Sequence, residues 1–136
     1  MLTLFRLTYL IVVCVGFLTN CVPAQTDDPT EAYQLWAAGN VPPQVRVIQG
    51  NYWRSAHFTY EYVVYLKIAA PTVWTRTFIQ QNKLVRSATD SARVSPAPVW
   101  FKPPKSCIVW EHPGAWENRY YQDTISTDFF IYEMQL

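Results

Sequence analysis

The sequence predicts an α+β domain in which two short helices cover an antiparallel sheet of about five strands. Two segments, around Ala32 and around Trp74, have apolar residues at helical spacing, and most of the remaining chain alternates between apolar and polar residues. The alternating stretches follow one another through connections of hairpin length, which favours antiparallel pairing. The expected order of elements is α-β-β-α-β-β-β.

The first helix is expected to begin at Pro29 and to run for about ten residues, with Trp36 on its apolar face. Asp28 is a suitable N-cap residue, proline suits the first helical position, and Glu31 can return a bond to the cap backbone. Gly39 is expected to end the helix.

Two strands should follow this helix. Residues 44–49 form a short strand, and Gly50-Asn51 is predicted as a turn. From Phe58 to Ile68 the residues alternate, and the side that carries Tyr62 and Leu66 is wholly apolar or aromatic. We expect that side to face the core and the opposite side to be half covered.

A second helix is predicted over residues 73–82, where Trp74 and Phe78 lie one turn apart. A long loop over residues 86–98 follows it, and Val99–Lys102, which lies between prolines, should be extended. The tail of the chain is predicted to form three strands, over residues 107–111, 118–122 and 128–136.

The first residues have the pattern of an export signal. Leu7–Leu18 is an uncharged apolar run that follows Arg6 and precedes a polar stretch. Its length suits the hydrophobic region of a signal peptide, whereas spanning a bilayer takes ~20 apolar residues. The sequence therefore predicts a protein that leaves the cytoplasm.

The end of this run, Leu18-Thr19-Asn20-Cys21, resembles the lipobox of bacterial envelope lipoproteins, although Asn20 stands where that family usually has Gly, Ala or Ser. The resemblance implies a lipid on Cys21 and a membrane-anchored location in the cell envelope. The domain limits are then 1–21 for the signal, 22–28 for a short polar tether and 29–136 for one α+β domain. Alternatively, Val22-Pro23-Ala24 fits an ordinary signal-peptidase site, and cleavage after Ala24 would release a secreted protein.

Composition argues against binding of nucleic acid and against a disulfide scaffold. Without Arg6, ten basic residues face ten acidic ones, so the mature chain has no excess of basic residues for binding nucleic acid. Of three cysteines, Cys14 lies in the signal and Cys21 is the lipid acceptor that the resemblance implies, which leaves Cys107 without a disulfide partner or a CxxC motif.

The sequence points to no metal, no cofactor and no catalytic residue. A zinc site takes three or four ligands, and His57, His112 and Cys107 would have to meet through the fold to supply them. A pair of Cys107 with a histidine, or of Glu111 with Glu117 across a turn, leaves a small hydrolase as one alternative function.

Aromatic residues are the strongest signal for a binding site. Six tryptophans occur in this chain, and Trp36, Trp74 and Trp110 lie on apolar faces where the core is expected. The other three fall in predicted turns or proline-flanked segments, where exposed Trp and Arg are typical of interface hot spots. The candidate partner-binding residues are Trp53, Arg54, Trp100, Phe101 and Trp116.

These observations together predict an exported, lipid-anchored, non-enzymatic domain that binds another envelope or secreted protein, as an inhibitor or assembly factor does. The main alternative is a glycan-binding module that stacks sugars on exposed tryptophans. The membrane is the second expected partner, through the lipid on Cys21. The sequence leaves the oligomeric state open.

Overall fold

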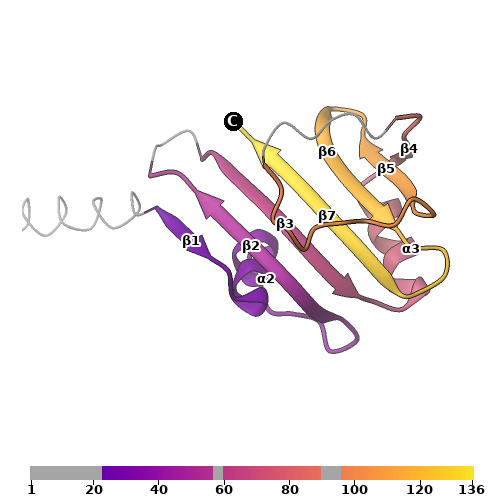
Figure 1. The fold of residues 1–136 in the computed structure, drawn as a ribbon, viewed down its shortest axis with the longest axis horizontal. Helices are drawn as coiled ribbons and strands as arrows, with labels where there is room; N and C mark the ends of the chain where they lie inside the picture. The colour runs from indigo at the N-terminus through magenta and orange to yellow at the C-terminus, as the bar shows by residue number, and fades with distance from the viewer. Residues whose placement is uncertain (1–22, 57–59, 90–95) are drawn as a thin grey trace, which may run out of the picture.

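The computed structural model describes residues 23–56, 60–89 and 96–136. It confirms an α+β fold with an antiparallel sheet and two helices (Figure 1). Over the described ranges the sheet has seven strands, in the order β1-β2-β3-β7-β6-β5-β4, so the expectation of about five was too low. The elements are β1 (Ala24–Thr26), α2 (Pro29–Ala37), β2 (Arg46–Arg54), β3 (Tyr62–Ala69), α3 (Thr72–Gln81), β4 (Val85–Arg86), β5 (Ile108–His112), β6 (Ala115–Gln122) and β7 (Asp128–Gln135).

The two additional strands, β1 and β4, form the edges of the sheet. With three residues and two residues they are too short to show an alternating pattern in the sequence. β1 pairs with the end of β2, where Ala24 lies opposite Arg54 and Gln25 opposite Trp53. The segment 22–28, expected as a polar tether, therefore contributes a strand to the domain.

Helix α2 begins as the sequence predicts. The backbone N–H of Glu31 donates to Oδ1 of Asp28 at 2.8 Å, and Pro29 occupies the first helical position. The Glu31 carboxylate instead accepts from the hydroxyl of Thr26, which ties the helix to β1. The helix ends at Ala37, and the residue that takes the left-handed conformation after it is Ala38, with φ of 51°, one residue before the predicted Gly39.

The prediction of a turn at Gly50 is wrong. Gly50 lies in the middle of β2, where it pairs with Leu66. A Cβ added at Gly50 would lie 2.8 Å from Cβ of Ala32 and 2.9 Å from Cα of Pro29. Helix α2 therefore packs directly on the backbone of β2, and the glycine is required by this close approach.

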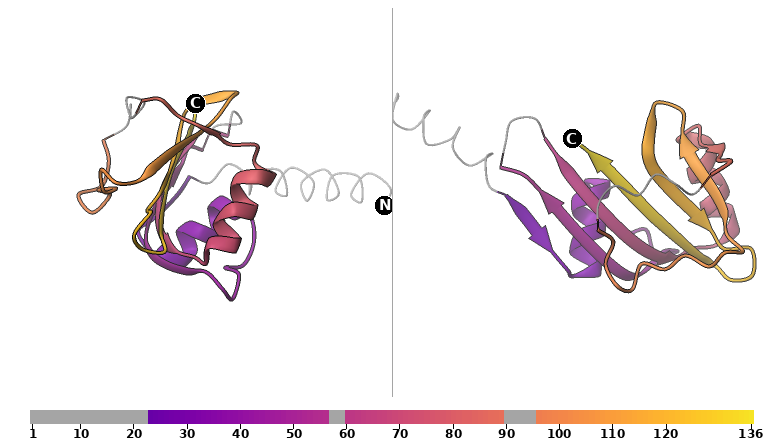
Figure 2. Two further views of the ribbon diagram at one scale, coloured as in Figure 1. Left: turned by 90° about the vertical axis from the view of Figure 1, so that its right-hand side faces the viewer. Right: turned by 45° about the horizontal axis from the view of Figure 1, so that its top comes forward.

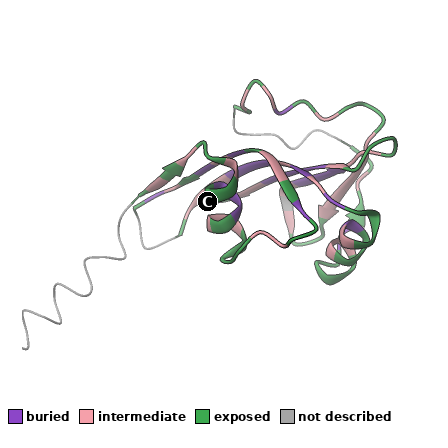
Figure 3. Cartoon of the chain, turned by 90° about the horizontal axis from the view of Figure 1, so that it is seen from below, coloured by how far each residue is buried: buried purple, intermediate pink, exposed green. Residues whose placement is uncertain are grey.

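Both helices lie on one side of the sheet, which we call the helix face (Figure 2). The main core lies there, and the outward surfaces of the helices are exposed (Figure 3). On β3 this face carries Val64, Leu66 and Ile68, so the predicted alternation is confirmed from Tyr62 onward. Tyr60, predicted on the same core-facing side, instead lies before the strand and is 51% exposed. Residues 57–59, including the start of the predicted strand and His57, lie outside the described residues.

The opposite side of the sheet, the loop face, has a second core built on Tyr65, Tyr121, Phe130 and Tyr132. The segment of residues 96–107, before β5, crosses in front of β7 and β3 and covers this core (Figure 1). Phe101 is 2% exposed and contacts Tyr65 edge to face, with ring centroids 4.9 Å apart.

This crossing segment differs from the prediction for Val99–Lys102. The chain turns there instead of extending, and the N–H of Phe101 donates to the carbonyl of Pro98 at 2.9 Å. The turn points the Phe101 ring onto the sheet. Phe130, Tyr132 and Met134 of β7 share the loop face as predicted, whereas Leu136 is 80% exposed.

Candidate functional sites

The five candidate partner-binding residues do not form one exposed patch. Phe101 belongs to the loop-face core, and Trp100 is half-buried against it, with ring centroids 5.8 Å apart. Trp53 and Arg54 lie at the end of β2, beside β1. Trp116 belongs to β6, and its side chain lies outside what the structure describes.

Trp53, Arg54 and Tyr60 make up what we call the anchor corner, next to the first residue of β1. Trp53 is 39% exposed and Tyr60 is 51% exposed. The Arg54 guanidinium lies over the Tyr60 ring, 5.4 Å from its centroid. Tyr60 has a φ of 54°, a left-handed backbone that non-glycine residues seldom adopt and that costs about 1–3 kcal/mol. The fold thus holds an exposed ring in place at some cost.

A carboxylate with three neutral donors lies on the helix face. Glu133 of β7 accepts from the indole N–H of Trp36 at 2.8 Å, from the hydroxyl of Tyr62 at 2.9 Å and from the hydroxyl of Tyr120 at 2.7 Å. These donors come from α2, β3 and β6, so the cluster connects one helix to three neighbouring strands.

The same cluster shifts the acidity of its tyrosines. Burial, and then the charge of the Glu133 carboxylate, raise the pKa of Tyr62 and Tyr120 above the ordinary value of 10.0. Both hydroxyls therefore remain protonated donors well above neutral pH, and the cluster is suited to holding the sheet together.

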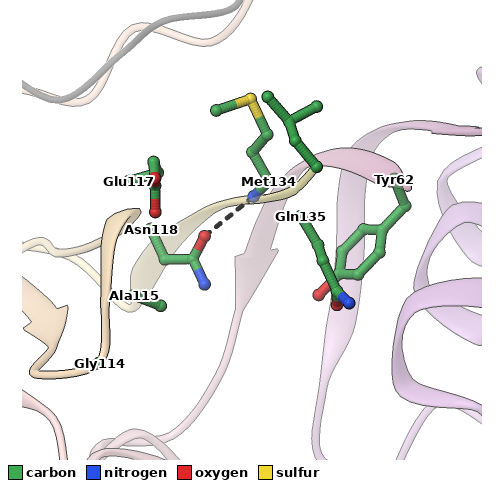
Figure 4. Close-up of a pocket in the computed structure, with 8 residues that line it drawn as sticks. Tyr62, Gly114, Ala115, Glu117, Asn118, Met134 and Gln135 are labelled. Carbon is green, nitrogen blue, oxygen red and sulfur yellow. Dashed lines mark hydrogen bonds between the residues drawn. The ribbon is translucent and has the colours of Figure 1, made fainter. Parts of the chain in front are cut away.

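Beside this cluster the sheet divides. β6 pairs with β7 only from Arg119 onward. Beyond that point the Met134 N–H donates to Oδ1 of Asn118 at 2.9 Å instead of to a backbone carbonyl (Figure 4). We call this division between β6 and β7 the fork, and it holds an open pocket of about 300 Å³, the fork pocket. Its lining comprises Tyr62, Gly114, Ala115, Glu117, Asn118, Met134, Gln135 and Leu136.

A second hollow lies towards the β4 edge of the sheet, between α3 and the strands β5 and β6, and we call it the α3 groove. It has a volume of about 360 Å³ and is mainly apolar, with Ile79 and Trp110 among its lining residues. The Trp110 indole N–H donates to Gln122 at 3.2 Å, which leaves its ring against the groove. Arg76 is the charged residue of this lining.

Large apolar side chains are exposed close to the α3 groove. Val73 follows the lining residue Thr72 and is 73% exposed, and Ile125, in the turn after Gln122, is 85% exposed. Thr72 and residues of this turn line one small pocket together, so α3 begins beside the turn. The groove itself combines Trp110 and Ile79 with an arginine, Arg76, and aromatic, apolar and Arg side chains of this kind are typical of protein interfaces.

The residues considered for catalysis have other partners. Glu111 accepts from Ser87 at 2.6 Å and pairs with Arg119 at 3.3 Å. Cys107 packs against the loop-face core, and Nδ1 of His112 accepts from the N–H of Gly114. Within the described part of the chain, no three His, Cys, Asp or Glu residues are grouped as metal ligands.

Comparison of the chain with known protein families, curated proteins and solved structures finds no match. In the described ranges neither helix has the length and apolar character needed to cross a membrane. The fold class and the sites above are therefore the basis for a functional assignment.

Sequence reasoning missed the α3 groove because it assigned Trp110 to the core by its apolar neighbours. That assignment is half right, since the ring packs on the core and also lines the groove. A signal was present in Gln122, a polar residue at the end of an aromatic strand, but only the pairing of Trp110 with Tyr120 brings it close.

Proposed function

We propose that the protein is an exported, lipid-anchored, non-enzymatic domain that binds another envelope protein through the α3 groove. The observation that carries this proposal is the apolar groove lined by Ile79 and Trp110, with exposed Val73 beside it. An exposed apolar area that adjoins a groove favours a protein partner.

The charge of the groove indicates the chemistry of that partner. Arg76 is exposed, and no carboxylate belongs to the groove lining. A segment that inserts an apolar side chain beside Ile79 and carries an acidic residue next to it would satisfy both features. The lipid on Cys21, which the resemblance to lipoproteins implies, keeps the domain and such a partner in one compartment.

Site-specific photo-crosslinking in whole cells tests the proposal. A photo-reactive residue at Gln80, which lines the groove, should crosslink to one defined envelope protein, and the same residue at exposed Lys105 should not. Arg76→Glu should reduce the crosslink by at least about tenfold, which corresponds to ~1.4 kcal/mol. Lys105→Glu is the matched control, since it changes charge equally on the other face.

Equal crosslinking from Gln80 and Lys105, or no effect of Arg76→Glu in a folded variant, would exclude the α3 groove as the interface. The variant's fold can be verified from its thermal unfolding, because Arg76 is exposed on α3 and its replacement leaves the core intact.

The fork pocket favours glycan binding as a second candidate function. It combines the carboxylate of Glu117 with the amides of Asn118 and Gln135, groups that hydrogen-bond sugar hydroxyls. Titration with cell-wall oligosaccharides, followed by NMR, should shift signals of residues 114–118 if this candidate holds. Shifts that persist unchanged in the Glu117→Gln and Gln135→Ala variants would count against it.

A further inference from the structure

We infer that the anchor corner, formed by Trp53, Arg54 and Tyr60, lies in the lipid headgroup layer of the membrane that carries the protein. The inference rests on the proposed anchoring through Cys21 and goes beyond it, because it assigns a surface of the folded domain to the bilayer.

The length of chain between anchor and fold supports this placement. Strand β1 begins at Ala24 and pairs there with Arg54. Only three residue steps separate Cys21 from Ala24, and such a stretch reaches at most about 11 Å when fully extended. A lipid on Cys21 therefore brings the paired ends of β1 and β2 to the bilayer surface.

The side chains at this corner suit a headgroup layer. Trp and Tyr are enriched at membrane interfaces, where an apolar ring with a polar edge is solvated on both sides. Trp53 and Tyr60 are two of the large apolar or aromatic side chains that the fold leaves exposed. Tyr60 has a left-handed backbone, which is strained for a residue other than glycine. Such strain persists only where the surrounding structure fixes the backbone, so the fold itself holds Tyr60 in its outward position.

The charge of the corner selects the kind of membrane surface. Arg54 is accompanied by Glu61, which is half-buried near the start of β3, so the described residues of the corner carry no excess of positive charge. Anionic lipid attracts clusters of basic residues, and none occurs here. The corner therefore fits a zwitterionic headgroup layer, and the rings, not the charges, make the contact.

Fluorescence quenching on vesicles tests the inference. The mature, acylated protein is incorporated into phosphatidylcholine vesicles that contain lipids brominated near the headgroup. We expect quenching of tryptophan emission that is lost in Trp53→Phe and retained in Trp74→Phe, since Trp74 packs on the helix-face core. Addition of phosphatidylglycerol should leave the quenching unchanged.

Each outcome decides a separate point. Acylated protein whose quenching is the same in Trp53→Phe and the wild type overturns the membrane contact and leaves the α3 groove unaffected. A mature chain that begins at Gln25 without an acyl group, detected from its intact mass, overturns the anchor and the membrane contact together. Quenching that grows with phosphatidylglycerol would show that charge makes the contact and would overturn the role of the rings.

Discussion

At the scale of single residues, Glu133 is a side chain on which three hydrogen bonds of the helix face converge. Its two oxygens accept three hydrogen bonds from neutral donors on α2, β3 and β6. A buried donor that loses its acceptor costs about 1–3 kcal/mol, whereas a satisfied one contributes modestly. Glu133 is therefore more important for what its removal exposes than for its own net contribution.

Replacement of Glu133 should be costly in proportion to the donors left without an acceptor. We expect Glu133→Leu to lower the free energy of unfolding by about 3–5 kcal/mol, because it leaves the donors of Trp36, Tyr62 and Tyr120 unpaired. Glu133→Gln keeps one acceptor oxygen and should cost clearly less. Urea unfolding measures both variants, and equal losses would contradict the assigned hydrogen bonds.

The two tyrosines of the cluster predict a loss of stability in alkali. Because the folded state raises the pKa of Tyr62 and Tyr120 above 10.0, their contribution is complete below pH ~10 and decreases as the pH rises further, when the unfolded chain ionises first. Tyr120→Phe should weaken this decrease while lowering stability at neutral pH. Unfolding followed between about pH 8 and 11 tests it, and an unchanged pH profile would refute the assignment.

At the scale of elements, the notable packing contact is that of α2 with the backbone of β2. It depends on Gly50, where a Cβ would lie 2.8 Å from Ala32. We expect Gly50→Ala to destabilise the protein by about 1–3 kcal/mol, the usual cost of overpacking. Gly39→Ala is the control, since a Cβ added there would lie 3.9 Å from the carbonyl oxygen of Ala37, an ordinary contact distance. Thermal unfolding that shifts equally in both variants would argue against this close approach.

The same glycine shows why part of the fold could not be predicted. A Gly-Asn pair is a good turn signal when only neighbours in sequence are considered. In the structure a glycine is needed at position 50 because Ala32 of α2 packs against it, and this contact joins residues far apart in the chain. The caps and alternation of α2, β3 and β7 depend on local sequence and were predictable.

The candidate sites were less predictable than the elements. Proline-flanked Phe101 resembles an exposed loop residue, yet a turn folds it onto β3 and β7. The fork pocket and the α3 groove are each built from segments that meet only through the sheet order. The sequence gives the number of tryptophans, but the contacts between distant segments decide which of them are exposed.

At the scale of the whole molecule, the proposed anchor and the proposed partner site lie at opposite edges of the sheet. Five strand spacings separate β1 from β5 in the sheet order, a distance of about 24 Å. The anchor corner can therefore contact a membrane while the α3 groove remains accessible to a protein in the adjacent space (Figure 1).

A longer connection should separate these two properties. Insertion of ten Gly and Ser residues directly after Cys21 adds a root-mean-square reach of about 17 Å. We expect the quenching of Trp53 by brominated lipid to fall, while crosslinking from Gln80 in the α3 groove continues. A matched ten-residue insertion in the exposed turn around Ile125 should leave the quenching as it is. Quenching that survives the first insertion would mean that the corner binds lipid without help from the anchor.

The pairing of β1 gives the molecule a defined mechanical weak point. If the domain is pulled by its partner while the lipid holds Cys21, the load enters through Ala24 and acts along a strand held by only three residue pairs. β2, β3 and β7, with eight residues or more each, share a much longer seam and resist better. β1 would separate first and lengthen the link to the membrane. Under tension the molecule would lengthen by the residues of β1 that separate from β2, while the lipid anchor and the partner site stay bound.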